Sequence, residues 1–139
     1  MNPMLEGILE TALYAEDLDA AEAFYEGTLG LSKITRAGNR HVFFRCGPGV
    51  LLIFNPAETV KLPAADAALP VPPHGMHGQG HACFRVSKEN IDAMAARLKA
   101  AGVAIEADFH WPNGGRSIYF RDPDGNSLEC AEAVIWGLV

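Results

Sequence analysis

The feature that most constrains this chain is an internal repeat. From Glu10 the sequence reads ETALYAEDLDAAEAFYEGTLGL, and from His81 it reads HACFRVSKENIDAMAARLKAAGV. Each copy begins with alternating residues that are typical of a strand, continues at helical spacing and stops at a glycine. The repeat therefore predicts two copies of one small folding unit.

Each copy predicts the same order of elements. Asp17 and Ser87 are expected to cap two helices, whose apolar stripes are Leu18, Ala21, Phe24 and Tyr25 in the first copy and Ile91, Met94, Ala95 and Leu98 in the second. Three strand-like segments follow each helix, at 32–36, 40–46 and 50–55 and at 104–110, 116–121 and 126–131. We therefore predict an α+β fold in which two βαβββ modules form a curved eight-stranded mixed sheet around a cleft.

The predicted modules lie within one domain over residues 1–139. Module one covers about 8–56, a proline-rich linker covers 57–79, and module two covers about 80–133. A net charge of -6 without a basic block argues against a nucleic-acid partner. No apolar run is long enough to span a membrane and the first residues lack a signal pattern, so we expect a cytoplasmic protein. The three cysteines have no C-x-x-C spacing and are expected to be buried thiols.

Strand alternation brings three chemically active side chains toward the predicted cleft. Glu10 and His81 occupy equivalent positions in the two copies, and Glu129 faces the same side from the last strand. Two carboxylates and one imidazole suit a divalent metal ion, which identifies Zn, Ni, Mn, Co and Fe as candidates. The alternative is that the two carboxylates lie at the rim and pair with arginine or water, while His81 is structural.

The repeat and two of its phrases resemble the vicinal oxygen chelate superfamily, which includes glyoxalases, bleomycin resistance proteins and extradiol dioxygenases. The phrases are ALYAEDLDAAEAFYEGTLGL and RSIYFRDPDGNSLECAE. The resemblance implies metal ligands on the first and last strand of each module, which correspond here to Glu10, His81 and Glu129. The remaining ligand position falls near Leu51, which cannot coordinate, so the four-ligand pattern of glyoxalase I is incomplete.

The resemblance implies a metal-dependent enzyme of the glyoxalase type that acts on a small oxygen-chelating substrate, as a lyase, isomerase or thiol transferase. An extradiol ring-cleaving dioxygenase is the alternative, because His110, Tyr119 and the D-P-x-G spacing before Glu129 resemble that signature. His110 and Tyr119 are then expected near the metal. Arg116 is expected as an anion contact because thiol transferases of the superfamily hold an anion with basic residues around the cleft. A metal-free protein that binds a drug or metabolite is the third possibility. Members commonly form homodimers, in some cases with modules exchanged between chains.

Overall fold

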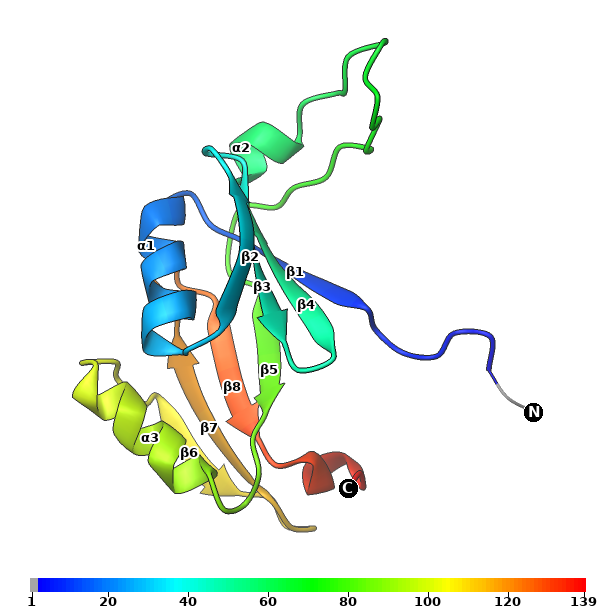
Figure 1. The fold of residues 1–139 in the computed structure, drawn as a ribbon. Helices are drawn as coiled ribbons and strands as arrows, with labels where there is room; N and C mark the ends of the chain where they lie inside the picture. Colours follow the sequence, from blue (N-terminus) through cyan, green and yellow to red (C-terminus); the bar gives the residue numbers. More distant parts are fainter. Residues whose placement is uncertain (1–2) are drawn as a thin grey trace. The chain divides into compact units, whose positions relative to one another are not determined.

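The computed structural model describes residues 3–139, which divide into two compact units. The first unit ends at His77 and the second begins at Gly78, close to the predicted end of the linker. All eight predicted strands are present, and they form two four-stranded sheets. Within each unit, a helix covers one face of the sheet (Figure 1). The prediction of two βαβββ modules is confirmed.

The first unit contains the four strands that were predicted around its helix. They are β1 (Glu10–Tyr14), β2 (Ser32–Ala37), β3 (His41–Cys46) and β4 (Gly49–Phe54), in the sheet order β1-β4-β3-β2. β1 runs parallel to β4, and the other neighbours are antiparallel. The helix α1 (Leu18–Glu22) continues into the π-helical segment η1 (Ala23–Thr28). Its predicted apolar stripe is buried throughout.

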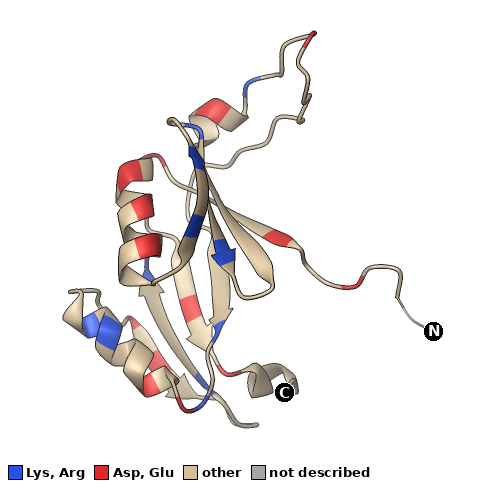
Figure 2. Ribbon diagram, viewed as in Figure 1, with Lys and Arg blue, Asp and Glu red and all other residues tan. Residues whose placement is uncertain are grey.

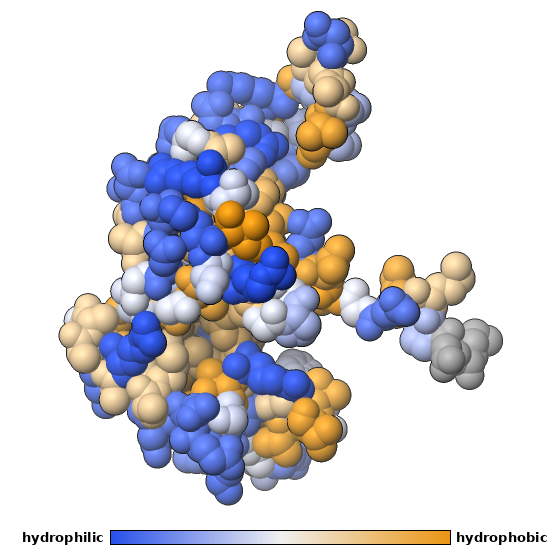
Figure 3. Space-filling view, in the orientation of Figure 1, coloured by the Kyte–Doolittle hydropathy of each residue, from blue (hydrophilic) through white to orange (hydrophobic). Residues whose placement is uncertain are grey.

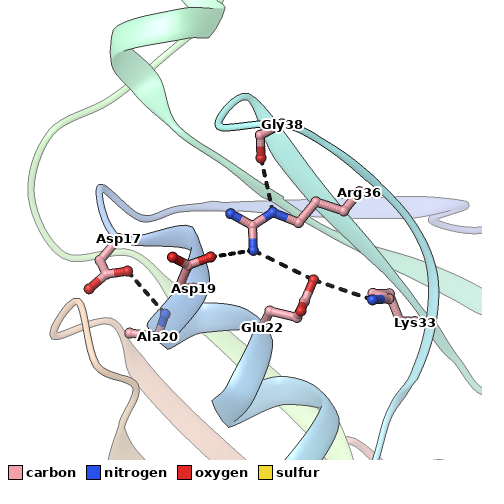
Figure 4. A network of polar contacts seen from close by, with 7 residues as sticks. All are labelled: Asp17, Asp19, Ala20, Glu22, Lys33, Arg36 and Gly38. Atoms are coloured by element: carbon pink, nitrogen blue, oxygen red, sulfur yellow. Dashed lines mark hydrogen bonds and ion pairs between the residues drawn. The ribbon is translucent and has the colours of Figure 1, made fainter.

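Opposite charges hold α1 against β2, as Figure 2 shows by the acidic colour of the helix beside basic positions on the strand. Arg36 Nη1 lies 2.7 Å from Asp19 Oδ1 and 3.7 Å from Glu22 Oε1. Lys33 also pairs with Glu22, at 3.5 Å. The predicted cap is confirmed, because Asp17 Oδ1 accepts from the amide of Ala20 (Figure 4). The buried apolar stripe packs the helix on one side of the sheet, and these ion pairs at its edge add to that contact.

The second unit repeats the same topology. Its strands are β5 (His81–Arg85), β6 (Ala107–His110), β7 (Arg116–Arg121) and β8 (Ser127–Ala131), in the order β5-β8-β7-β6. The helix α3 (Ile91–Ala100) buries three of its four predicted stripe residues, and Met94 is half-buried. The capping prediction at Ser87 is wrong. Its carbonyl accepts from the amides of Asn90 and Ile91, so a turn separates Ser87 from the helix, whose cap residue is Asn90.

The predicted linker contains one short helix that the sequence analysis missed. This is α2 (Pro56–Thr59), where Asn55 accepts from the amide of Ala57 and proline occupies the first helical position. The amide of His74 later donates to the carbonyl of Thr59, which brings the end of the linker back to the helix. Residues 60–73 thus form a loop whose two ends meet at α2, and this largely exposed loop projects away from the sheet (Figure 1).

The chain ends in a 3-10 helix, η2 (Ala133–Trp136), that follows β8. Large apolar side chains are exposed here, with Trp136 at 79% and Leu138 at 57%. Figure 3 shows this apolar surface at the C-terminal segment. Across residues 3–139, none of the helices has the length and apolar character needed to cross a membrane.

Candidate functional site

Strand register sorts the side chains of the second sheet onto two faces. One face packs against α3 and buries Ile118, Phe120, Leu128 and Cys130. The opposite face, called the open face below, carries Glu129, which lies between Cys83 on β5 and Tyr119 on β7. His81 lies on the same face, two positions before Cys83 on β5. Ser117 also lies on this face, two positions before Tyr119 on β7. Both module-two residues that were predicted as metal ligands are therefore on the open face.

The D-P-D-G-N loop aligns the strands that carry these two residues. Asp122 Oδ1 accepts from the amides of Asp124 and Asn126, and its other oxygen accepts from the Asn126 amide side chain. Gly125 has φ 91°, a conformation that favours glycine. Asn126 Oδ1 then accepts from the amide of Gly80, just before β5. The loop thus fixes the start of β5 beside the start of β8, and His81 beside Glu129.

Glu129 is buried, with 5% of its surface exposed, and it is held by several hydrogen-bond donors. Ser117 Oγ donates to Glu129 Oε2 over 2.5 Å, and Trp111 Nε1 donates in turn to Ser117 Oγ over 2.7 Å. Hydrogen bonds from Tyr119 and Cys83 also reach the carboxylate. The side chain is therefore oriented by residues of two strands, β5 and β7, and by the loop after β6.

His81 presents one ring nitrogen to this carboxylate. Its Nδ1 lies 2.9 Å from the carbonyl oxygen of Ser127, and a carbonyl only accepts, so Nδ1 carries the hydrogen. In the neutral ring, Nε2 then has a lone pair, and it lies 3.4 Å from Glu129 Oε1. Two electron-pair donors therefore face each other, an arrangement that a shared proton or a bound cation stabilises.

The thiol and the phenol beside Glu129 remain protonated at neutral pH. Burial, followed by the charge and hydrogen bond of Glu129, raises the pKa of Cys83 to about 12. Burial and the same carboxylate raise the pKa of Tyr119. Both groups therefore keep a hydrogen beside Glu129, and the thiol of Cys83 also lies 3.9 Å from the carbonyl oxygen of Phe84. All three cysteines are free. Cys83 is exposed as a residue, although its thiol is partly desolvated beside Glu129, and Cys46 is half-buried, so the expectation that every cysteine is buried is wrong.

The third predicted ligand, Glu10, lies in the other unit. It is the first residue of β1, it is exposed, and it lines a pocket of about 730 Å³ on the first sheet. Within either unit, the described residues contain no group of three His, Cys, Asp or Glu side chains arranged to hold a metal ion. The structure thus brings His81 and Glu129 together, and the set of three ligands remains a prediction.

Two of the predicted catalytic residues, His110 and Arg116, lie on the face of the sheet opposite Glu129. Arg116 on β7 lies opposite His110 on β6 in the strand register, and both are on the face that packs against α3. Arg116 binds both oxygens of Asp108 over 2.8 Å and also pairs with Asp92 of α3. Arg116 therefore joins helix to sheet, as Arg36 does in the first unit. Tyr119 lies on the open face, and His110 lies on the other face of the same sheet.

Leu52 is the residue of the first sheet that matches Glu129. It lies opposite Ala12, as Glu129 lies opposite Cys83, and opposite Phe43, as Glu129 lies opposite Tyr119. The sequence analysis had placed this position near Leu51, but Leu51 faces the helix. The conclusion that a leucine occupies the fourth ligand position is unchanged.

Sequence reasoning missed Ser117 and Cys83 as partners of Glu129, and it missed the hydrogen bond from Trp111 to Ser117. The alternation of β7 contains a usable signal, because Ser117 and Tyr119 must face the same side as Glu129. The role of Trp111 has no such signal, since it follows β6 and its position depends on the turn at residues 112–115.

Comparison with known proteins agrees with this architecture. Residues 7–130 match the family model of the Glyoxalase/Bleomycin resistance protein/Dioxygenase superfamily. The chain belongs to this superfamily. The prediction from the repeat and its two phrases is therefore confirmed.

Several members of the glyoxalase superfamily are similar over most of the chain. The crystal structure of a lactoylglutathione lyase from Agrobacterium tumefaciens has a TM-score of 0.89 and 46% identity, and the match covers 97% of this chain and 99% of that one. Glutathione transferase FosA from Serratia marcescens is 31% identical over 91% of this chain and 80% of its own length. The fosfomycin resistance protein FosX from Listeria monocytogenes shares the fold, with a TM-score of 0.67 at 23% identity.

Proposed function

We propose that this chain is a divalent-metal-dependent enzyme of the glyoxalase type, a lyase, isomerase or thiol transferase that acts on a small substrate with adjacent oxygens. The observation that carries this proposal is the pair formed by His81 Nε2 and Glu129 Oε1 at 3.4 Å. Each member of the pair has a partner on its far side, Ser127 for the imidazole and Ser117 for the carboxylate. Such outer partners are typical of metal ligands.

The donor set limits which ions fit. His81 and Glu129 supply one nitrogen and one oxygen ligand, and Glu10 is proposed as the third. Imidazole and carboxylate together suit Zn, Ni, Mn, Co or Fe. Cys83 is protonated beside Glu129 and therefore is not proposed as a ligand. When bound, such an ion supplies Lewis-acid stabilisation of an oxyanion that develops on the substrate.

The similar proteins support the glyoxalase type over ring cleavage. The names of the lyase and of the transferase both refer to glutathione, which favours a substrate that reacts with or contains a thiol. Leu52 at the position that matches Glu129 argues against a four-ligand site. His110 lies on the face that packs against α3, so it is not beside Glu129 on the open face, where the dioxygenase alternative needs it.

Metal binding to the full chain tests this proposal. The protein is treated with chelator, titrated with Mn²⁺ or Zn²⁺, and compared with Glu129→Gln and Glu106→Gln. Glu106 is an exposed carboxylate in the same unit that pairs with Arg121, so it provides a matched control. We expect one ion per chain in the wild type and in Glu106→Gln, and a loss of at least about 100-fold in affinity in Glu129→Gln. Equal binding by both variants would refute the metal site.

We further propose a homodimer, with Glu10 and the His81–Glu129 pair contributed either by one chain or by two. The exposed Trp136 and Leu138 supply apolar surface for a second chain. Mixing Glu10→Gln with Glu129→Gln distinguishes the two arrangements. If modules are exchanged, mixed dimers contain one intact site, and about a quarter of the wild-type metal capacity returns after random reassembly. If each site lies within one chain, none returns.

A further inference from the structure

The first unit has a pocket of its own, of about 730 Å³. It lies on the face of the first sheet opposite α1, which is called the open face of that sheet below. Strand residues form its floor, and the linker loop adds apolar side chains from Leu62 to Val71. Leu52 and Phe54 are buried at 8% and 6% exposure, although they face away from α1. A pocket of this size and apolar character is typical of a site for one small organic molecule.

Aromatic rings line the end of the pocket that is nearest the linker. The ring of Phe54 lies 5.4 Å from that of Phe43 and 4.6 Å from that of His74, measured between centroids. The rings of His41 and Phe43 stack at 4.0 Å, with an angle of 8° between their planes. Flat rings in such arrangements favour a flat, conjugated ligand.

One cation is available at this aromatic end. Arg40 lies over the Phe54 ring at 5.6 Å, and its Nη1 donates to His41 Nδ1 over 2.6 Å. Among the described residues, no carboxylate forms an ion pair with Arg40, whereas the nearby Lys61 is paired with Glu58 at 3.0 Å. Because Arg40 occupies Nδ1, the neutral His41 ring carries its hydrogen on Nε2 and is a second donor. The guanidinium of Arg40 and the Nε2 hydrogen of His41 therefore both favour the binding of an anion.

A buried hydroxyl also lines the pocket. Thr59 is 3% exposed, and its Oγ1 forms no hydrogen bond within the part of the chain that the structure describes. A buried polar group without a partner is rare in folded proteins and is costly unless a ligand satisfies it. His74 is bonded to the same residue through the backbone and to Tyr14 Oη through Nδ1 over 2.6 Å. These contacts give His74 a structural role, because they join the end of the linker to α2 and β1.

The pocket has opposite charges at its two ends. Glu10 and Tyr14 begin and end β1, so they are separated by about 13 Å along the strand. Arg40 contacts Phe54, which lies opposite Tyr14, whereas Glu10 lies opposite Val50. An anionic group is therefore attracted to the aromatic end and repelled from the end that carries Glu10.

We propose that this pocket binds an aromatic carboxylate, with its ring against Phe43 and Phe54 and its carboxylate at Arg40. Binding of this ligand requires no metal. The inference that aromatic carboxylates are also the substrates rests on the proposed function. In that case the far end of the bound ligand points toward Glu10, the proposed third metal ligand.

Calorimetric titration of the chelator-treated full chain with 2-naphthoate tests this inference, with uncharged 2-naphthamide as the matched ligand. We expect a Kd below about 1 mM for naphthoate and about tenfold weaker binding of the amide. Arg40→Gln should weaken naphthoate about tenfold and leave the amide unchanged. Arg45→Gln is the control, because Arg45 is an exposed arginine on β3, the strand that begins just after Arg40, and it does not line the pocket.

Two further variants separate this inference from the metal proposal. Thr59→Val keeps the side-chain shape, and it should weaken naphthoate several-fold without lowering the stability of the protein. Glu129→Gln should bind naphthoate as the wild type does, even though it loses the metal. Absence of naphthoate binding, or equal binding by the wild type and Arg40→Gln, would overturn the inference and leave the metal proposal standing.

Discussion

The open faces of the two sheets share one backbone register but differ in chemistry at their centres. On the second sheet, the central position is Glu129, with Cys83 and Tyr119 as its cross-strand neighbours. On the first sheet, the same position is Leu52, with Ala12 and Phe43 beside it. One face therefore stabilises a charge, and the other provides an apolar pocket.

The comparison shows that the duplicated module fixes where side chains meet but not what they do. A buried carboxylate is tolerated at Glu129 because donors from the neighbouring strands surround it. No equivalent donors surround Leu52, where the cross-strand partners are apolar. The two faces are therefore specialised, one for holding a cation and the other for holding an organic ligand.

Placing a carboxylate in the first sheet should have the largest effect. Leu52→Glu buries a charge at a position that is 8% exposed and lacks hydrogen-bond donors on its neighbouring strands. We expect the free energy of unfolding to fall by about 3 kcal/mol, measured by urea denaturation. Leu52→Met controls for the change in shape and should cost less than about 1.5 kcal/mol. Similar stability of the two variants would mean that the faces are not specialised.

Removing a donor from Glu129 should have the next largest effect. Ser117→Ala leaves Glu129 Oε2 and Trp111 Nε1 without their shared partner. We expect metal affinity to fall by about tenfold in a direct titration. Ser127→Ala is the control, because His81 bonds only to the backbone carbonyl of Ser127. Equal affinities in the two variants would show that Ser117 does not support a ligand.

Arg116→Gln tests whether this residue is structural. Loss of its bonds to Asp108 and Asp92 should lower the free energy of unfolding by about 1 kcal/mol. Metal affinity should not change, since Arg116 lies on the face opposite Glu129. A variant of normal stability with weakened metal binding would restore Arg116 to the site.

The reactivity of Cys83 should show the smallest effect. Its pKa is raised to about 12, so alkylation by iodoacetamide should be slow at pH 8 and rise with pH, because only the thiolate reacts. Glu129→Gln removes a charge that raises this pKa, so labelling at pH 8 should become several-fold faster. Cys46 serves as the internal reference in peptide mass spectrometry. Unchanged labelling of Cys83 would contradict the proposed contact with Glu129.

Much of the fold could be predicted from the sequence because alternation and helical spacing are local patterns. They located both modules, the buried stripe of α1 and the face that carries His81 and Glu129. Local patterns did not reveal α2, which depends on the cap at Asn55 and the proline at its first position. They also did not assign faces to His110 and Arg116, because these predictions followed a family signature rather than the register of β6 and β7. The contact between His74 and Tyr14 depends on a loop closure over 60 positions, which no local pattern encodes.

X-ray absorption spectroscopy of the protein loaded with one equivalent of Zn²⁺ tests the central claim most directly. The account predicts a shell of nitrogen and oxygen ligands that includes one imidazole, without sulfur, and it predicts that His81→Gln removes the imidazole signal. A sulfur ligand, or an imidazole signal that persists in His81→Gln, would contradict the assignment of His81 and Glu129 as the pair that holds the ion.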